Sequence, residues 1–200
     1  MMRITLLALA LALGTTTAAH AQDVAWNVDP AHSRVGFEAR HLAFAKVSGK
    51  FNEFSGKITA DAKTGKLKSV EATVKASSVD TDNKKRDDHL RSDDFFAADK
   101  HPTLSLKTKS ITWQGNKFTA VAALTIRGIT KDVTFKGELL GAQMVNFGQG
   151  KHMRAAYEAT ATIDRKQFGL KFGGVAEGIS IVGDKVEIEL QIEASHTPTK

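Results

Sequence analysis

VDTDNKKRDDHLRSDDFFAADKHPTLSL, residues 79–106, is the segment where the strand-like alternation of this chain stops. It is rich in aspartate, yet it carries two adjacent phenylalanines, Phe95 and Phe96, and alternation resumes only after Pro102. Long connections between strands of a compact domain are usually lids or binding loops. The segment therefore predicts a cap over an interior that accepts an apolar molecule.

The polar half of this segment has the composition of a short helix. Asp82 or Asn83 can cap a helix of about two turns over residues 84–91 through a side-chain oxygen, and Asp93 can cap a further turn. The side chains expected either to hold this lid together or to contact the head group of a ligand are Arg86, Asp87, His89, Phe95 and Phe96.

Outside the lid, apolar residues recur at every second position, which is the pattern of half-buried β-strands. A change of phase at Asn52–Glu53 indicates a bend in one long strand. Turn residues at 114–116 and 127–130 indicate hairpins, and Gly-rich residues 167–183 indicate a second loop at one mouth. About eight strands joined by short turns predict an all-β, antiparallel sandwich or barrel with one helical insertion. The expected strands are residues 34–40, 47–60, 70–76, 103–112, 117–126, 132–140, 154–164 and 185–194.

The inward face of these strands combines large apolar side chains with many small ones, such as Ala72, Ala120 and Gly137. An eight-stranded barrel is either filled by its own side chains or holds one small ligand. The small residues fit both an elongated apolar cavity and a tight core in which strands approach closely. The side chains expected to line a cavity are Phe37, Phe51, Phe54, Leu104, Leu106, Phe118, Leu124, Ile126 and Phe135.

The N-terminus has the pattern of an export signal. Arg3 precedes an uncharged apolar run over residues 4–14, and Ala19-His20-Ala21 has the small-x-small form that signal peptidase accepts. Cleavage is expected after Ala21, which leaves residues 22–200 as a single periplasmic or secreted domain. The run is too short to span a bilayer, which needs about 20 apolar residues, so no membrane-spanning segment is expected.

The chain has 28 Lys and Arg against 22 Asp and Glu, a formal net charge of +6, and no cysteine. The densest basic run, Lys84-Lys85-Arg86, is followed at once by Asp87-Asp88, so the contiguous basic face that binds nucleic acid is not expected. A loose attraction to anionic lipid head groups is more compatible with export. The absence of cysteine excludes disulfides, thiolate nucleophiles and Cys-ligated zinc.

Two arrangements could carry chemistry, and the pattern argues against both. His32 and Ser33 could join Asp87 in a hydrolase triad, but neighbouring side chains on a strand point to opposite faces and no Gly-x-Ser-x-Gly elbow is present. The histidines considered as metal ligands show no close two-histidine spacing on one element; they are His41, His89, His101 and His152. No catalytic residue, metal or cofactor is therefore expected.

A series of short motifs resembles the YceI family. In chain order they are Trp26-x-x-Asp29-Pro30-x-His32-Ser33, Phe37, His41-Leu42, Gly49-x-Phe51-x-x-Phe54-x-Gly56, Arg86-Asp87-x-His89-Leu90, Phe95-Phe96-x-Ala98, Pro102, Leu124-Thr125-Ile126-x-Gly128-Ile129-Thr130, Asp164-Arg165-x-x-Phe168-Gly169-Leu170 and Gly183-Asp184-x-Val186. The resemblance implies an extended lipocalin-like barrel that holds a long amphiphile, such as a polyisoprenoid or fatty-acid derivative. It also implies a periplasmic or secreted protein, no established enzymatic activity and a possible homodimer. Residues 146–153 and 196–200 depart from the family pattern.

We therefore expect a non-enzymatic carrier of a long apolar molecule. Two other classes of protein fit the alternation: an interaction or adhesion module with a solid barrel, and an outer-membrane barrel, whose pattern is the same turned inside out. The aromatic girdles of an outer-membrane barrel are missing, because Trp26, Trp113 and Tyr157 are the only available belt residues. An internal cavity would distinguish the carrier from the solid barrel.

Overall fold

The computed structural model describes residues 22–146, 148 and 150–198. The expected signal peptide, residues 1–21, lies outside the described residues. The strands are β1 (Asp23–Val28), β2 (Arg34–His41), β3 (Ala45–Phe51), β4 (Phe54–Asp61), β5 (Leu67–Lys75), β6 (Val79–Asp80), β7 (Thr103–Gln114), β8 (Lys117–Ile126), β9 (Ile129–Asn146), β10 (Lys151–Asp164), β11 (Val175–Ala176), β12 (Ile179–Ser180) and β13 (Val182–His196). The helices are α1 (Lys84–Arg91) and the 3-10 helices η1 (Pro30–His32), η2 (Ala76–Ser78) and η3 (Arg165–Phe168).

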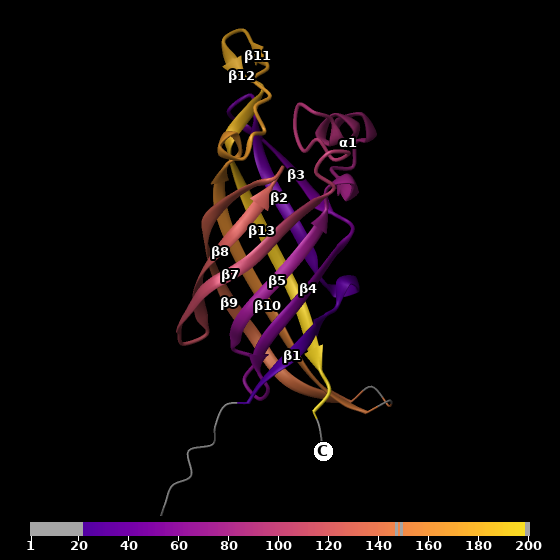
Figure 1. Ribbon diagram of the computed structural model, residues 1–200, viewed down its shortest axis with the longest axis vertical. Helices are drawn as coiled ribbons and strands as arrows, with labels where there is room; N and C mark the ends of the chain where they lie inside the picture. Colours follow the sequence, from indigo (N-terminus) through magenta and orange to yellow (C-terminus); the bar gives the residue numbers. More distant parts are fainter. Residues whose placement is uncertain (1–21, 147, 149, 199–200) are drawn as a thin grey trace, which may run out of the picture.

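The strands pair antiparallel all the way round the molecule (Figure 1). Pairing runs through β4, β5, β7, β8, β9, β10 and β13, and β13 then pairs with β2 towards one end and with β1 towards the other. β2 pairs with β3, and β1 pairs with β4. Because β3 and β4 are consecutive parts of one bent stretch of chain, these pairings close the ring. Across the described residues the result is an eight-stranded antiparallel barrel with one α-helix, as the alternation and the resemblance predict.

The predicted bend at Asn52–Glu53 is confirmed, and it divides the expected strand 47–60 into β3 and β4. Before the bend, Phe51 pairs with Val35 of β2, whereas after it Phe54 pairs with Val74 of β5. The break lets one stretch of chain serve two neighbours while its apolar side chains keep facing inward.

β9 extends beyond its predicted bounds at both ends. β9 begins at Ile129 because Arg127 and Gly128, with φ of 52° and 73°, form a two-residue turn of the kind that suits a tight hairpin. It then continues to Asn146, paired with β10, well past the predicted end at residue 140. Residues 141–146, GAQMVN, lack a clear alternation of apolar and polar residues, which concealed this extension.

The lid helix α1 matches the predicted residues 84–91. Asn83 caps it, since its side-chain oxygen accepts a hydrogen bond from the Arg86 backbone N–H at 3.1 Å. The predicted cap at Asp93 is wrong, because the Asp93 carboxylate instead accepts from Lys100 Nζ at 2.5 Å. The turn that carries Phe95 is closed by its backbone N–H bonded to the Ser92 carbonyl at 3.1 Å.

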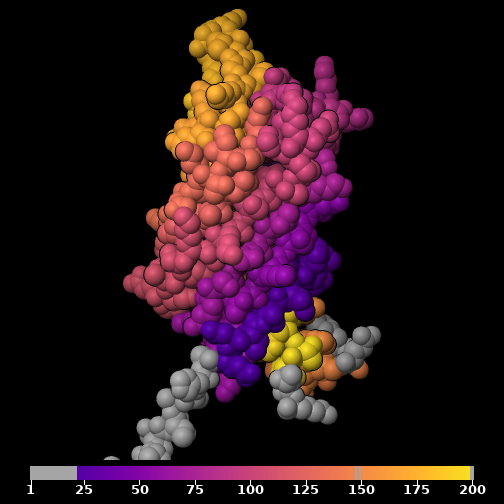
Figure 2. Space-filling view, viewed as in Figure 1, coloured from indigo at the N-terminus to yellow at the C-terminus, as the bar shows by residue number. Residues whose placement is uncertain are grey.

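The lid lies at the end of the barrel opposite β1, and the β11–β12 hairpin extends from the same end (Figure 1). In Figure 2 the lid and the segment around residues 170–183 cover this end together. The Gly-rich segment is therefore a second loop at the same mouth.

The turn between β4 and β5 is held by a buried carboxylate. Asp61 Oδ1 accepts from the backbone N–H and the hydroxyl of Thr64 at 2.7 and 2.6 Å, and from the Lys63 N–H at 3.2 Å. These bonds, that of the Thr64 hydroxyl first, hold the pKa of Asp61 below its usual range.

Because the folded pKa is lowered, Asp61 stabilises the fold above its ordinary pKa of 3.8, and this contribution is lost as the pH falls below that value. We expect Asp61→Asn to lower the free energy of unfolding by about 1–2 kcal/mol at neutral pH, with the difference from the parent shrinking below pH 3.8. Urea unfolding at a series of pH values measures this. Asp99→Asn, at an exposed lid residue, is the control; an unchanged pH profile in Asp61→Asn would contradict the assignment.

Candidate ligand-binding cavity

The barrel encloses an apolar cavity of about 210 Å³ at the lid end. A smaller space of about 80 Å³ continues from it towards the β1 end. The two spaces share six lining residues, which places them in succession inside one barrel: Ile58, Val70, Leu106, Phe135, Leu190 and Ile192. The interior therefore holds room that its own side chains do not occupy.

All nine residues predicted to line a cavity border one of these two spaces. Phe118 lines the smaller one, Leu106 and Phe135 line both, and the other six line the larger one. Of the five lid residues, Phe95 and Phe96 line the larger cavity. The structure thus brings eleven of the fourteen predicted side chains to the same interior.

The polar lid residues Arg86 and Asp87 lie at the start of the lid, away from the cavity wall. Asp87 is buried and accepts from the Thr81 N–H at 2.9 Å and the Thr81 hydroxyl at 2.6 Å. Arg86 donates to the same hydroxyl at 2.7 Å and to the Thr81 carbonyl at 2.8 Å. Neither residue lines the cavity, so their contacts anchor the start of the lid, the structural role that was one of the two expected for them.

Several residues not predicted to line the cavity do so from the strand with the clearest alternation. Ile188, Leu190 and Ile192 of β13 point inward at period two but stay only half-buried, because they border the cavity. Three further lining residues lie outside the strands and carry no period-two signal: Leu90 of α1, Arg165 of η3 and Leu170.

The sequence left open whether the small inward residues leave a cavity or allow a tightly packed core, and the structure contains both. Ala39, Gly56 and Ala72 line the larger cavity, where their lack of bulk leaves space. Ala60 and Ala194 are completely buried near the β1 end, where strands pack closely. Both expectations therefore hold, each at a different level of the barrel.

The β1 end is closed by packed aromatic side chains. Trp26 is 1% exposed, its Nε1 donates to the Ala60 carbonyl at 3.3 Å, and its ring lies edge-on to His196 at 4.5 Å between centroids. Tyr157 donates to the Gly65 carbonyl at 2.6 Å, and burial raises the pKa of this phenol. A ligand would therefore reach the cavity from the lid end.

At the lid end, the two covering loops meet through three rings. Phe95 of the lid and Phe172 of the second loop lie 5.1 Å apart between ring centroids. His89 contacts Phe95 at 5.1 Å and Phe172 at 5.0 Å, both edge-on, and bonds the Asp94 carboxylate at 2.8 Å. We call these three rings, His89, Phe95 and Phe172, the aromatic seam. Arg127 of the β8–β9 turn secures the lid by donating to the Phe95 carbonyl at 2.8 Å.

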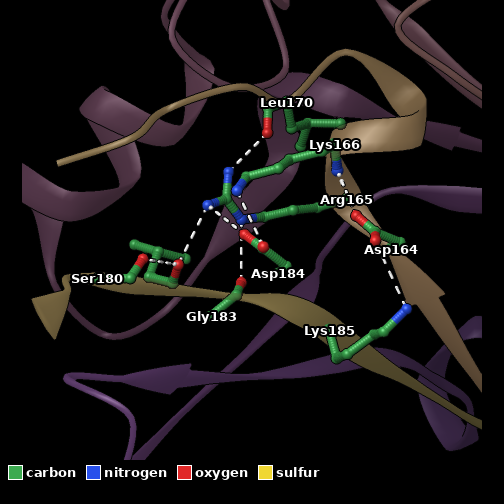
Figure 3. Close-up of polar contacts among 9 residues, drawn as sticks. Asp164, Arg165, Lys166, Leu170, Ser180, Gly183, Asp184 and Lys185 are labelled. Carbon is green, nitrogen blue, oxygen red and sulfur yellow. Dashed lines mark hydrogen bonds and ion pairs between the residues drawn. The ribbon is translucent and has the colours of Figure 1, made fainter. Parts of the chain in front are cut away.

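A buried arginine organises the base of the second loop (Figure 3). Arg165 is 2% exposed, and its guanidinium donates to the carbonyls of Leu170, Gly183 and Val182 at 2.6, 2.9 and 3.1 Å. Its Nη2 also lies 3.3 Å from the Asp184 carboxylate. Four acceptors thus bind this one charged side chain of the cavity wall, which ties both ends of the loop to the barrel.

Residues 26–194 match the YceI-like domain family. A UPF0312 protein of Pseudomonas paraeruginosa is 34% identical over 195 residues, which cover 96% of this chain and 98% of that relative.

The chain belongs to the YceI-like domain family.

Solved structures agree with this fold. The YceI protein of Campylobacter jejuni superposes with a TM-score of 0.69 at 27% identity, over 80% of this chain and 90% of that one. A polyisoprenoid binding domain from Saccharophagus degradans shares the fold at a TM-score of 0.63 and 12% identity, over 86% of this chain and 98% of that one.

Several motifs of this YceI-like domain now have a structural explanation. A Cβ on Gly49 would come within 2.3 Å of the Phe37 ring, so this glycine makes room for a cavity-lining aromatic side chain. Asp164 caps η3 by accepting from the Lys166 N–H at 3.0 Å, which positions Arg165. His196, beyond the motifs, ends β13 and packs on Trp26.

The residues considered for catalysis lie apart in this YceI-like domain. Ser33 Oγ accepts from the Glu193 backbone N–H at 3.0 Å, while the Asp87 carboxylate is bonded to Thr81 in the lid. His32 bonds Asp29 at 3.0 Å, outside the lid. No triad geometry exists among them.

One group in the described residues has the spacing of metal ligands: Asp29, His32 and Glu193 offer ligand atoms within 4.8 Å of one another. Arg154 Nη1 contacts both carboxylates of this group, at 3.2 Å from Asp29. A guanidinium between the carboxylates gives an ion-pair cluster, which joins the β1–β2 connection to β10 and β13. The His32 hydrogen bond is the main cause that holds the pKa of Asp29 below its usual range.

The aromatic seam leads to a kinetic prediction. Phe172 contacts Phe95 and His89 but does not line the cavity, so Phe172→Ala loosens the cover with little loss of ligand contact. We expect the dissociation rate of a bound fluorescent lipid to rise about tenfold with a smaller change in Kd, measured by stopped-flow displacement. Phe172→Leu keeps an apolar cover, so its dissociation rate should lie between those of the parent and Phe172→Ala. An unaltered dissociation rate in Phe172→Ala would mean that the ligand leaves elsewhere.

Proposed function

We propose that this YceI-like domain is a non-enzymatic binding protein that holds the apolar chain of an amphiphilic lipid, a polyisoprenoid or fatty-acid derivative, inside its barrel. The observation that carries the proposal is the cavity of about 210 Å³, which is walled by aliphatic and aromatic side chains and continues towards the closed end. Each buried methylene contributes about 0.8 kcal/mol before the costs of association. A chain of on the order of ten methylenes would thus bind with useful affinity.

Two further features support a carrier over an interaction module with a solid barrel. The lid contributes Phe95 and Phe96 to the cavity wall, so the insertion covers a space and not a filled core. The fold is shared with the polyisoprenoid binding domain from Saccharophagus degradans. A smooth apolar wall selects chain width and length more strongly than chemistry, so we expect several related lipids to bind.

The proposed place of action is the periplasm, or the outside of the cell, after cleavage behind Ala21. The N-terminal pattern supports this location. No helix among the described residues has the length and apolar character needed to cross a membrane. The homodimer implied by the family resemblance is a prediction that light scattering of the purified protein measures.

Extraction of the protein purified from its native host tests the function. The protein is denatured and extracted into organic solvent, and the extract is analysed by mass spectrometry. We expect a long-chain lipid in stoichiometric amount. Empty extracts, combined with no uptake of prenyl or fatty-acyl probes by the refolded protein, would overturn the proposal in favour of the interaction module.

A further inference from the structure

Large apolar side chains are exposed at the end of the barrel that carries the lid. Phe44 is 73% exposed in the β2–β3 turn, and Val175 and Ile179 are 61% and 45% exposed in the β11–β12 hairpin. The hairpin forms the extreme end of the molecule in Figures 1 and 2. We call these three side chains, Phe44, Val175 and Ile179, the apolar tip.

The two parts of the apolar tip are joined to each other. The Leu42 N–H and His41 Nδ1 both bond the carbonyl of Ile181, at 3.2 and 2.9 Å, so the β2–β3 turn lies against the base of the hairpin. The Ile181 N–H in turn donates to the Gly174 carbonyl at 2.9 Å, which closes that base. The tip is therefore one surface built from two segments.

Apolar contacts continue from the tip to the cavity. Phe172 precedes the hairpin by two glycines, Gly173 and Gly174. Its ring belongs to the aromatic seam together with Phe95, which lines the cavity. Leu170 and Val182, at the two ends of the same loop, line the cavity as well. A lipid tail that leaves the cavity at the seam would thus meet apolar side chains out to the extreme end of the molecule.

Three basic residues lie on or beside the segments that form this surface, and the neighbouring lid carries exposed aspartates, among them Asp93, Asp94 and Asp99. Arg40 lies under the tip, where its Nη1 donates to the Phe44 carbonyl at 3.0 Å, and Lys171 is exposed beside Phe172. At the start of β9, Lys131 is exposed two residues after Ile129, whose Cδ1 would lie 3.2 Å from a Cβ on Gly169 in the loop. The acidic residue within the hairpin is Glu177. Protruding apolar side chains with cations nearby favour binding to the interface of an anionic bilayer.

We propose that this end of the barrel docks on a membrane surface with anionic head groups, and that lipid passes between the bilayer and the cavity through the aromatic seam. The inference rests on the proposed function and adds the source and the route of the ligand. A bilayer fits better than a protein partner because the tip consists of three side chains on protruding turns. A stable protein interface needs about 800 Å² from each partner.

Co-sedimentation with phosphatidylcholine vesicles, with and without phosphatidylglycerol, tests the docking. The variant is Phe44→Ser with Val175→Ser and Ile179→Ser. The matched control is Leu140→Ser with Met144→Ser, because these side chains of β9 are 55% and 50% exposed outside the lid end. We expect the parent and the control to bind phosphatidylglycerol vesicles equally, and the tip variant to bind about tenfold more weakly. Lys131→Gln with Lys171→Gln should reduce binding only to the anionic vesicles.

A second assay separates docking from ligand binding. When a fluorescent lipid is presented on cyclodextrin, the tip variant should take it up as the parent does, whereas uptake from vesicles should fall about tenfold. Failure of every protein to take up lipid from cyclodextrin would refute the proposed function. Equal vesicle binding by the parent and the tip variant, or no vesicle binding by the parent, would overturn the docking proposal alone.

Two controls guard the interpretation. Circular dichroism and the thermal midpoint show whether the tip variant is folded, and Phe44→Ser alone replaces it if it is not. If the substitutions change the oligomeric state by light scattering and leave vesicle binding unchanged, the tip contacts a second copy of this chain and the membrane proposal is wrong.

Discussion

Ala72→Phe is expected to reduce the affinity for a long-chain lipid by about a hundredfold. Ala72 lines the larger cavity from β5, where it pairs with Gly56 on one side and Leu106 on the other. A phenyl ring at this point would displace on the order of four methylene groups of the ligand, each worth about 0.8 kcal/mol. The free energy of unfolding should stay the same or rise, because the ring fills space that is open without ligand.

Titration with a fluorescent fatty-acid or prenyl probe measures this affinity. Ala123→Phe is the matched control, since Ala123 lies on β8 between the inward residues Ala122 and Leu124 and faces the opposite side of the sheet. The same added volume there should leave Kd unchanged. Probe binding of Ala72→Phe at the affinity of the parent would show that the ligand does not occupy the barrel.

Arg165→Met is expected to lower the free energy of unfolding by about 3–5 kcal/mol. Methionine replaces much of the volume but none of the donors, so the carbonyls of Leu170, Val182 and Gly183 lose their bonds in a buried place. Arg165→Lys should recover only part of the loss, because an ammonium cannot reproduce the planar arrangement of the guanidinium donors.

Urea unfolding measures the loss, and limited trypsin digestion provides a local readout. Arg165 holds both ends of the second loop, so its replacement should speed cleavage after Lys171. The control is Lys166→Met, which removes an exposed ion pair to the same Asp184 carboxylate and should cost less than about 1 kcal/mol. Equal stability of Arg165→Met and Lys166→Met would show that the buried network does not organise the loop.

Local patterns account for most of the agreement between sequence and structure. The lid helix over residues 84–91 follows from a capping side chain at Asn83 and a polar run that ends before the Phe95 turn. The bend at Asn52–Glu53 follows from a change of phase that any continuous strand would have to resolve. In both cases the signal and its structural effect lie within a few residues of each other.

The features that the sequence did not predict correctly depend on contacts between more distant residues. The Asp93 cap was wrong because Lys100, seven residues on, takes the carboxylate. The continuation of β9 to Asn146 depends on pairing with β10, which compensates for the weak strand pattern of those residues. In the sequence, Arg165 cannot be distinguished from a surface cation. Its buried role depends on four acceptors that the loop and β13 bring to it.

By itself, the sequence determined the all-β class, the approximate strands, the lid helix and the apolar set that faces inward, because alternation and helix capping act over short stretches of chain. The tertiary structure alone decided that Ala39, Gly56 and Ala72 leave a cavity while Ala60 and Ala194 pack tightly. It also decided that Phe172 meets Phe95 over the mouth. Unfilled volume and ring contacts depend on how strands and loops that are far apart in the sequence pack against one another. A local pattern of residues does not encode that packing.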